Sequence, residues 1–104
     1  MLDEGQKAAR LVIYGRVQGV FFRDWTVDTA SRLGLDGWVR NRSDGTVEAM
    51  LVGQEELVEK MIKECRTGPR MSKVENIDIS PARGIVKKGF ERKPTVNIHE
   101  RRGL

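Results

Sequence analysis

Two short segments of the sequence contain residue types that suit phosphate chemistry. The first, 15–23, has two glycines, Gly15 and Gly19, that let the backbone curl so that successive N–H groups point inward, and such a concavity binds anions. A helix is predicted to begin at Phe22, and its positive end adds to this attraction. Arg23 lies in its first turn, and a guanidinium donates paired hydrogen bonds to phosphate oxygens. The spacing alone also fits a simple turn beside a surface arginine.

Asn41 is the second candidate for a chemical role. It stands beside Asp44-Gly45, a strong hairpin signal. Its amide oxygen can accept a hydrogen bond from water and so fix the direction of that water, although a turn residue would have the same neighbours. A strand, a crossover helix and a second strand of one sheet run parallel, so both strands end at the same edge. We therefore expect Asn41 and the segment 15–23 to meet.

The hydrophobic pattern predicts the elements that would position these residues. Alternating apolar residues indicate four strands, and apolar residues at helical spacing indicate two helices. The strands are expected at 8–14, 36–42, 46–52 and 73–80, and the helices at 22–33 and from Glu55 to the Gly68-Pro69 stop. In the fourth strand Val74 is out of phase with Ile77, which a β-bulge would explain. The order βαββαβ predicts an α+β, ferredoxin-like fold, an antiparallel sheet with two helices on one face. A short fifth edge strand is expected within 84–92.

Length and composition narrow the possibilities. A chain of 104 residues suits one domain, which we place at 8–92, with a flexible N-terminus at 1–7 and a basic C-terminal tail at 93–104. The net charge of +4 favours encounter with anions but does not imply nucleic acid. One cysteine, Cys65, allows no internal disulfide and indicates a cytoplasmic location. One histidine far from that cysteine argues against a zinc site, and no segment has the roughly 18 apolar residues of a membrane span.

Both segments resemble the signature motifs of the acylphosphatase family. Residues 15–23 read G-R-V-Q-G-V-F-F-R, which is similar to the family's G-R-V-Q-G-V-x-[FY]-R. Residues 37–48 read G-W-V-R-N-R-S-D-G-T-V-E, which is similar to its G-W-V-x-N-x-x-D-G-x-V-E. The motifs occur in the family's order and separation, and the resemblance covers about residues 8–90. At the C-terminus the chain departs from the family pattern, because Gly89-Phe90 is followed by a further tail. This departure bears on the last strand and on the oligomeric state.

The resemblance implies an enzyme that hydrolyses acyl phosphates to a carboxylate and inorganic phosphate. It implies that Arg23 anchors the phosphate and that Asn41 orients the attacking water. The loop that would cradle the phosphate consists of Gly15, Arg16, Val17, Gln18, Gly19, Val20 and Phe21. We expect Phe22 and Trp38 to pack in the core or at its rim. We also expect no metal, no cofactor, no nucleic-acid or membrane partner, and a monomer.

The leaving group explains how so few residues could suffice. An acyl phosphate releases a carboxylate, whose conjugate acid has a pKa of roughly 4, so the group departs at neutral pH without being protonated. Catalysis then reduces to positioning and to stabilising charge on the phosphoryl oxygens. Two alternatives remain. The cradle could act on carbamoyl phosphate, as in acylphosphatase-like domains of carbamoyl-transfer proteins, or it could be a non-enzymatic anion-binding or RNA-binding module. Few aromatic residues (6%) speak against base stacking on the sheet.

Overall fold

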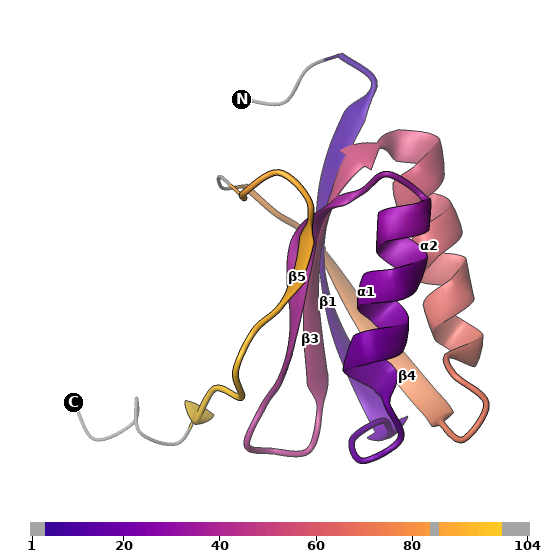
Figure 1. The fold of residues 1–104 in the computed structure, drawn as a ribbon, viewed down its shortest axis with the longest axis vertical. Coiled ribbons are helices and arrows are strands. Elements are labelled where there is room, and N and C mark those ends of the chain that lie inside the picture. Colours follow the sequence, from indigo (N-terminus) through magenta and orange to yellow (C-terminus); the bar gives the residue numbers. More distant parts are fainter. Residues whose placement is uncertain (1–3, 84–85, 99–104) are drawn as a thin grey trace.

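The chain folds into one sheet with both helices on the same face (Figure 1). The computed structural model describes residues 4–83 and 86–98. The elements in chain order are β1 (Gln6–Arg16), α1 (Phe22–Arg32), β2 (Asp36–Asn41), β3 (Val47–Gln54), α2 (Glu55–Thr67), β4 (Lys73–Pro81) and β5 (Phe90–Arg92). The predicted βαββαβ order and the ferredoxin-like class are thereby confirmed.

The sheet has the order β4-β1-β3-β2-β5. Strand β3 pairs antiparallel with both β1 and β2, so β1 and β2 run parallel with β3 between them. Both therefore end at the same edge, as the crossover rule predicts. The fifth strand differs from the predicted antiparallel sheet. Strand β5 pairs parallel with β2, so the sheet is mixed.

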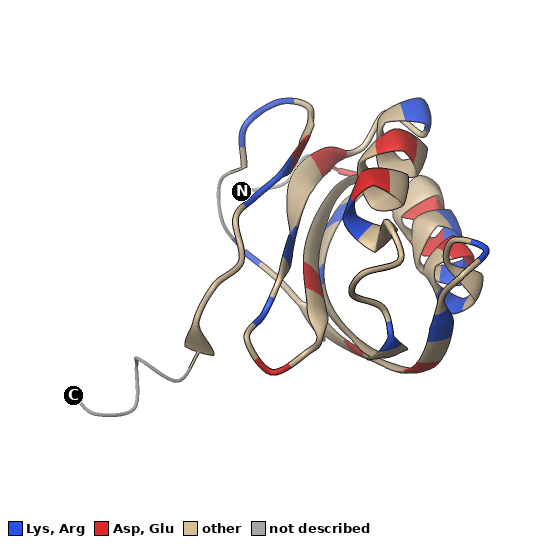
Figure 2. Cartoon of the chain, turned by 60° about the horizontal axis from the view of Figure 1, so that its bottom comes forward, with Lys and Arg blue, Asp and Glu red and all other residues tan. Residues whose placement is uncertain are grey.

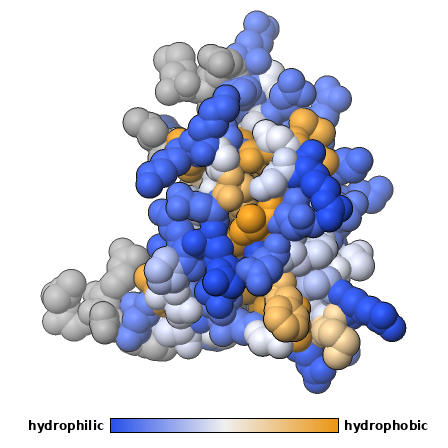
Figure 3. All heavy atoms as spheres, viewed as in Figure 1, coloured by the Kyte–Doolittle hydropathy of each residue, from blue (hydrophilic) through white to orange (hydrophobic). Residues whose placement is uncertain are grey.

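The core lies between the sheet and the two helices. Alternate residues of β1 and β3 face the helices, because successive side chains of a strand point to opposite faces. The fully buried side chains include Leu11 and Ile13 of β1, Val47, Ala49 and Leu51 of β3, and Phe22, Thr26, Ala30, Val58, Met61 and Cys65 of the helices. Burial raises the pKa of the Cys65 thiol to about 12. The surface seen in Figure 3 is mostly hydrophilic, with hydrophobic residues showing in patches between hydrophilic ones.

Helix α1 ends in a glycine cap, which returns the chain to β2. The Gly34 N–H donates to the Ser31 carbonyl and the Leu35 N–H to the Ala30 carbonyl, both at 3.0 Å. This is the Schellman pattern, which places its glycine in the left-handed region, and Gly34 has a φ of 73°. Leu35 is buried against the core, so the cap also sets where β2 begins.

Strand β4 pairs antiparallel with β1 and has the predicted bulge near the end of β1. The pairing register shifts between Tyr14, which lies opposite Asn76, and Gly15, which lies opposite Val74. Gly15 has a φ of 125°, and a Cβ atom there would lie 2.1 Å from the Lys73 carbonyl oxygen. A side chain would collide with this carbonyl oxygen, so the pairing of β1 with β4 requires glycine at position 15.

The sheet and its pairings extend to residues 6–7 and 93–98, which the expected boundaries leave to the N-terminus and the tail. Strand β1 already includes Gln6 and Lys7. At the other end residues 93–98 continue alongside β2, and Val96 forms a parallel bridge with Arg42. Residues 1–3, 84–85 and 99–104, which include parts of the expected N-terminus, edge strand and tail, lie outside the described residues.

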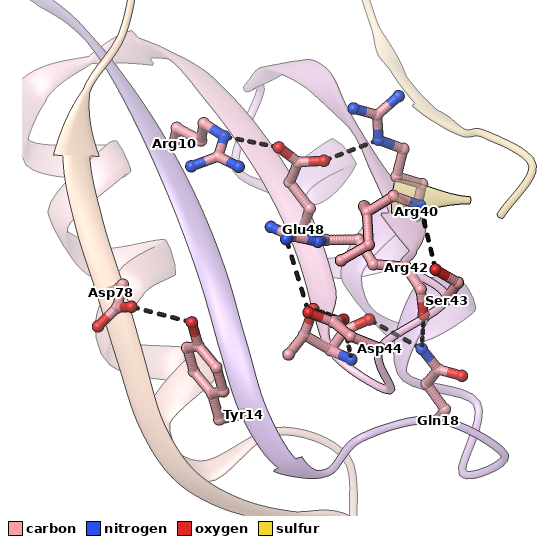
Figure 4. Close-up of polar contacts among 11 residues, drawn as sticks. Arg10, Tyr14, Gln18, Arg40, Arg42, Ser43, Asp44, Glu48 and Asp78 are labelled. Carbon is pink, nitrogen blue, oxygen red and sulfur yellow. Dashed lines mark hydrogen bonds and ion pairs between the residues drawn. The ribbon is translucent and has the colours of Figure 1, made fainter. Parts of the chain in front are cut away.

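Glu48 ties three strands together on the face of the sheet that the helices leave open (Figure 4). The Nε atoms of Arg10 on β1 and Arg40 on β2 donate to its two carboxylate oxygens at 2.6 and 2.8 Å. Glu48 is 4% exposed. Burial alone would raise its carboxyl pKa, but the hydrogen bonds from Arg40 and Arg10 outweigh burial and leave the pKa below its ordinary value.

Replacement of Glu48 by glutamine is therefore expected to lower the free energy of unfolding by about 1–3 kcal/mol at neutral pH. A carboxyl whose pKa is lowered by folding stabilises fully above its unfolded pKa of about 4.3, and this contribution is lost as the pH falls through the folded pKa. Urea unfolding at pH 7 and at about pH 3 measures the difference in the free energy of unfolding between wild type and Glu48→Gln. We expect this difference to be smaller at about pH 3 than at pH 7. The exposed Glu59, paired with Lys7, is the matched control, and Glu59→Gln should have little effect at either pH. If the difference in the free energy of unfolding between wild type and Glu48→Gln were the same at both pH values, the stabilising role of the ionised Glu48 carboxylate would be contradicted.

Candidate active site

A pocket of about 270 Å³ opens at the edge of the sheet where β1 and β2 end. Figure 2 is turned so that this edge comes forward. The pocket is lined by Val17, Gln18, Gly19, Phe21, Phe22, Arg23, Asp24, Asn41 and Arg92. The two side chains that the sequence pattern indicates for chemistry, Arg23 and Asn41, therefore line the same pocket.

The loop between β1 and α1 presents unused backbone N–H groups. No charged residue lies between Arg16 and Arg23 (Figure 2). Within residues 4–83 and 86–98, the amides of 18–21 donate no hydrogen bond to another group. Phe21, the N-cap of α1, has a left-handed backbone with φ 62° and gives no side-chain cap, so the first-turn amides of α1 are uncapped as well. An uncapped helix start beside a loop of free amides is a ready anion site.

Gln18 fixes the loop to the hairpin that follows Asn41. Its Nε2 atom donates to the carbonyl oxygens of Arg42 and Thr46, each at 2.8 Å (Figure 4). The hairpin itself is braced by Asp44, whose Oδ1 accepts from the Thr46 amide at 3.0 Å and from its hydroxyl at 2.6 Å. The hydroxyl hydrogen bond in particular holds the pKa of Asp44 below its usual range. The side chain of Gln18 thus positions the two halves of the pocket against each other.

Arg23 and Asn41 are half-buried in the pocket. Among the described residues, neither side chain makes a hydrogen bond or an ion pair. Asn41 is held through its backbone, since it lies opposite Val47 in the β2–β3 pairing and its carbonyl accepts from the Val96 N–H at 3.0 Å. A guanidinium and a carboxamide with free hydrogen-bonding groups are therefore directed by rigid elements toward one space.

Three of the seven loop residues predicted to cradle a ligand do not line the pocket. Gly15 and Arg16 belong to β1, where they pair with β4. Gly15 is needed where β4 pairs with β1, because the Lys73 carbonyl oxygen approaches it there. Val20 packs against the hydrophobic core. The predicted loop residues that do line the pocket are Val17, Gln18, Gly19 and Phe21.

Sequence reasoning missed Asp24 and Arg92 as pocket residues. The Arg92 Nη1 atom donates to Asp24 Oδ1 at 2.9 Å, and this ion pair lies at the exposed rim. Arg92 reaches the pocket because β5 pairs with β2 and sets Arg92 opposite Val39. The signal in the sequence was limited to the acidic residue in the first turn of α1 and the expected edge strand. Phe22, expected in the core, is 2% exposed and packs edge-to-face on Trp25.

The part of the chain that the structure describes contains neither a metal-binding cluster nor a helix that could span a membrane. No group of three or more His, Cys, Asp and Glu side chains there is arranged to hold a metal ion. None of the described helices has the length and apolar character needed to span a bilayer.

Solved structures with the same fold include acylphosphatases. The acylphosphatase from Coxiella burnetii is similar with a TM-score of 0.83 and 28% identity, covering 86% of this chain and 95% of that one. Full-length HypF, solved in a phosphate- and nucleotide-bound form, also matches with a TM-score of 0.83 and 28% identity. That match covers 89% of this chain but 12% of HypF, so the likeness is to one small part of that protein.

Sequence comparison gives the same result with higher identity. An acylphosphatase of Rhizorhabdus wittichii is 54% identical over 89 residues, which are 86% of this chain and 90% of the relative. The family model described as acylphosphatase matches residues 9–92. That span includes all the residues that line the pocket, from Val17 to Arg92. The chain is a member of the acylphosphatase family.

Proposed function

We propose that this protein is an acylphosphatase, which hydrolyses acyl phosphates to a carboxylate and inorganic phosphate in the pocket that contains Arg23 and Asn41. The observation that carries the proposal is the convergence of these two uncommitted side chains on a loop of free backbone amides. The acylphosphatase of Rhizorhabdus wittichii, 54% identical to this chain, supports the same activity.

The loop amides and Arg23 are proposed to bind the phosphoryl group. The amides of 18–21 and the start of α1 supply hydrogen bonds and a partial positive charge to its oxygens. The guanidinium of Arg23 adds a charged fork that matches two phosphate oxygens. Because these donors are fixed before the substrate binds, they stabilise the charge that spreads over the equatorial oxygens in the transition state.

Asn41 is proposed to orient the attacking water. Its amide oxygen accepts a hydrogen bond from the water, which leaves a lone pair of the water directed at phosphorus. The water oxygen bonds to phosphorus as the bond from phosphorus to the acyl oxygen breaks, and the electron pair leaves with the carboxylate. A proton of the water passes to a phosphate oxygen. The carboxylate needs no general acid, since its conjugate acid has a pKa of roughly 4.

Hydrolysis of benzoyl phosphate in the presence of EDTA tests this function. We expect turnover that EDTA does not reduce and that added Mg²⁺ does not raise. A phosphate monoester should not be hydrolysed, because its alkoxide leaving group would need a proton donor that the pocket does not offer. Carbamoyl phosphate belongs in the same assay as the alternative substrate. Loss of activity in EDTA with recovery on metal addition, or equal turnover of the monoester, would overturn the proposal.

We also propose that the enzyme acts as a cytoplasmic monomer without a nucleic-acid partner. The single cysteine is buried and its thiol pKa is raised, which suits a protein that needs no oxidising compartment. On the open face of the sheet the ring of Trp38 is covered by Arg40, at 4.6 Å, and by Lys93, at 5.2 Å. A ring so covered offers little platform for base stacking.

A further inference from the structure

We propose that residues 93–98, the C-terminal segment, position Asn41 for catalysis. The match to the family model covers residues 9–92, so this segment lies outside the matched span. The proposal rests on the function proposed for Asn41. It adds that turnover depends on main-chain hydrogen bonds from a segment that touches no substrate.

The C-terminal segment continues the pairing of β5 along β2 to the pocket. The Lys93 N–H donates to the Val39 carbonyl at 2.8 Å, and the Val96 N–H donates to the Asn41 carbonyl at 3.0 Å. Val96 then accepts from the Ser43 N–H at 3.0 Å. Finally the Ile98 N–H donates to Ser43 Oγ at 3.0 Å. Figure 1 shows the segment running on from β5 toward the end of the molecule that holds the β2–β3 hairpin.

The C-terminal segment pairs with β2 on the side away from β3, which would otherwise be an edge of the sheet. On its other side Asn41 pairs with Val47 of β3, while β5 stops at Arg92, opposite Val39. Past Val39, the described partner of the outer side of β2 is Val96. The Asn41 carbonyl and the Ser43 N–H therefore both pair with this one residue. Loss of these pairings would remove two backbone hydrogen bonds that hold the strand end on the side away from β3.

Side chains of the same segment lie on the open face of the sheet. Val96 and Ile98 line a hollow of about 380 Å³ together with Arg10, Arg40, Arg42 and Glu48. The ammonium of Lys93 lies over the ring of Trp38, a favourable cation–π arrangement. The segment is thus held at its start, middle and end, which is what a positioning role requires.

The expected effect is on the rate of the chemical step. A displacement of about 1 Å in a positioning group can cost 10²-fold in rate. The backbone hydrogen bonds of Lys93, Val96 and Ile98 go to β2 and to the hairpin after it, and not to the loop or α1 that hold the phosphate donors, so substrate affinity should change little. A lower kcat with an unchanged inhibition constant for inorganic phosphate is the signature that separates positioning from general destabilisation.

Val96→Pro in the full chain tests the proposal, because proline lacks the N–H that donates to Asn41. We expect its kcat for benzoyl phosphate to fall about 10- to 100-fold, with inhibition by inorganic phosphate within about threefold of wild type. Val96→Ala keeps the N–H and is the matched control, and it should retain most of the activity. Equal turnover of Val96→Pro and wild type would overturn the proposal, as would an equal loss in both variants.

A double variant separates this proposal from the function on which it rests. If the segment acts through Asn41, Val96→Pro should cause little further loss in an Asn41→Ala background. If the fold-losses of kcat in the two single variants multiply in the double variant, the inference is contradicted, whereas the role of Asn41 is left intact. If Asn41→Ala alone keeps wild-type turnover, the proposed function of Asn41 itself fails.

Two truncations give an independent check. A chain ending at Arg92 should show the same loss of kcat as Val96→Pro, whereas a chain ending at Ile98 retains every contact above and should match wild type. Far-ultraviolet circular dichroism and the Tm establish that each variant is folded. If the chain ending at Arg92 is folded and fully active, the proposal is wrong. If it does not fold, the comparison of Val96→Pro with Val96→Ala decides.

Discussion

Replacement of Arg23 by alanine is expected to lower kcat/KM for benzoyl phosphate by about 10²–10³-fold or more, comparable with the loss of an oxyanion donor. Two arginines line the pocket. Arg92 is hydrogen-bonded to Asp24 at the rim, whereas Arg23 makes no ion pair among the described residues. The uncommitted guanidinium lies in the first turn of α1, beside the free loop amides. It is thus the group best placed to meet charge on the phosphoryl oxygens.

Competitive inhibition by inorganic phosphate shows whether that loss reflects phosphate anchoring. We expect phosphate to inhibit Arg23→Ala far more weakly than wild type. Arg23→Lys should recover only part of the activity, because an ammonium has charge but no planar fork. Arg32→Ala removes an arginine from the last turn of the same helix, where it pairs with Asp28, and should be active. Wild-type inhibition of the Arg23→Ala variant would refute the anchoring role.

Most of the fold follows from periodicity in the sequence. The alternation of Val47, Ala49 and Leu51 fixes which face of β3 is buried, because a shift of one residue would expose all three. Gly34 marks the end of α1, since few other residues adopt its left-handed backbone without strain. These signals are local, so they can be interpreted without knowing the partners of each element.

The role of Gly15 could not be predicted in the same way. In the sequence it stands at the start of a glycine-containing loop, which is typical of an anion cradle. In the fold it is required by the Lys73 carbonyl, which belongs to β4, the last strand of the βαββαβ unit along the chain. A local sequence pattern cannot predict a contact between residues that lie so far apart in the chain. Gln18 is similar, because its side chain meets carbonyl groups of a distant hairpin.

The end of the chain was the least predictable part. Residues 93–98 pair with β2 through backbone groups, and main-chain pairing makes few demands on side-chain type. The segment contains Pro94 and basic residues, which resemble a solvated tail. The same reason explains why Arg92 was missed, since only the parallel pairing of β5 with β2 brings it to the pocket.

Replacement of Asn41 by alanine should separate binding from turnover. We expect kcat to fall by about 10²-fold, the scale of a lost positioning contact, while inorganic phosphate inhibits as in wild type. Asn41→Gln keeps the carboxamide but moves it by one methylene group, so it should restore little. Asn76→Ala removes an exposed asparagine of β4 that bonds Asp78 on the open face, and it should have wild-type kinetics. These four proteins need only the benzoyl phosphate assay and phosphate inhibition.

The different expected effects of Asn41→Ala on kcat and on the inhibition constant for inorganic phosphate follow from where Asn41 acts. Inorganic phosphate occupies the donors of the loop and Arg23 but contains no attacking water, so its affinity does not report on Asn41. A group that acts only on the water contributes to the transition state and not to the bound phosphate, and its loss lowers kcat with little change in binding. If Asn41→Ala instead weakened phosphate inhibition in proportion to kcat, Asn41 would be a phosphate ligand, and the water would need another partner. Wild-type turnover in that variant would remove Asn41 from the mechanism altogether.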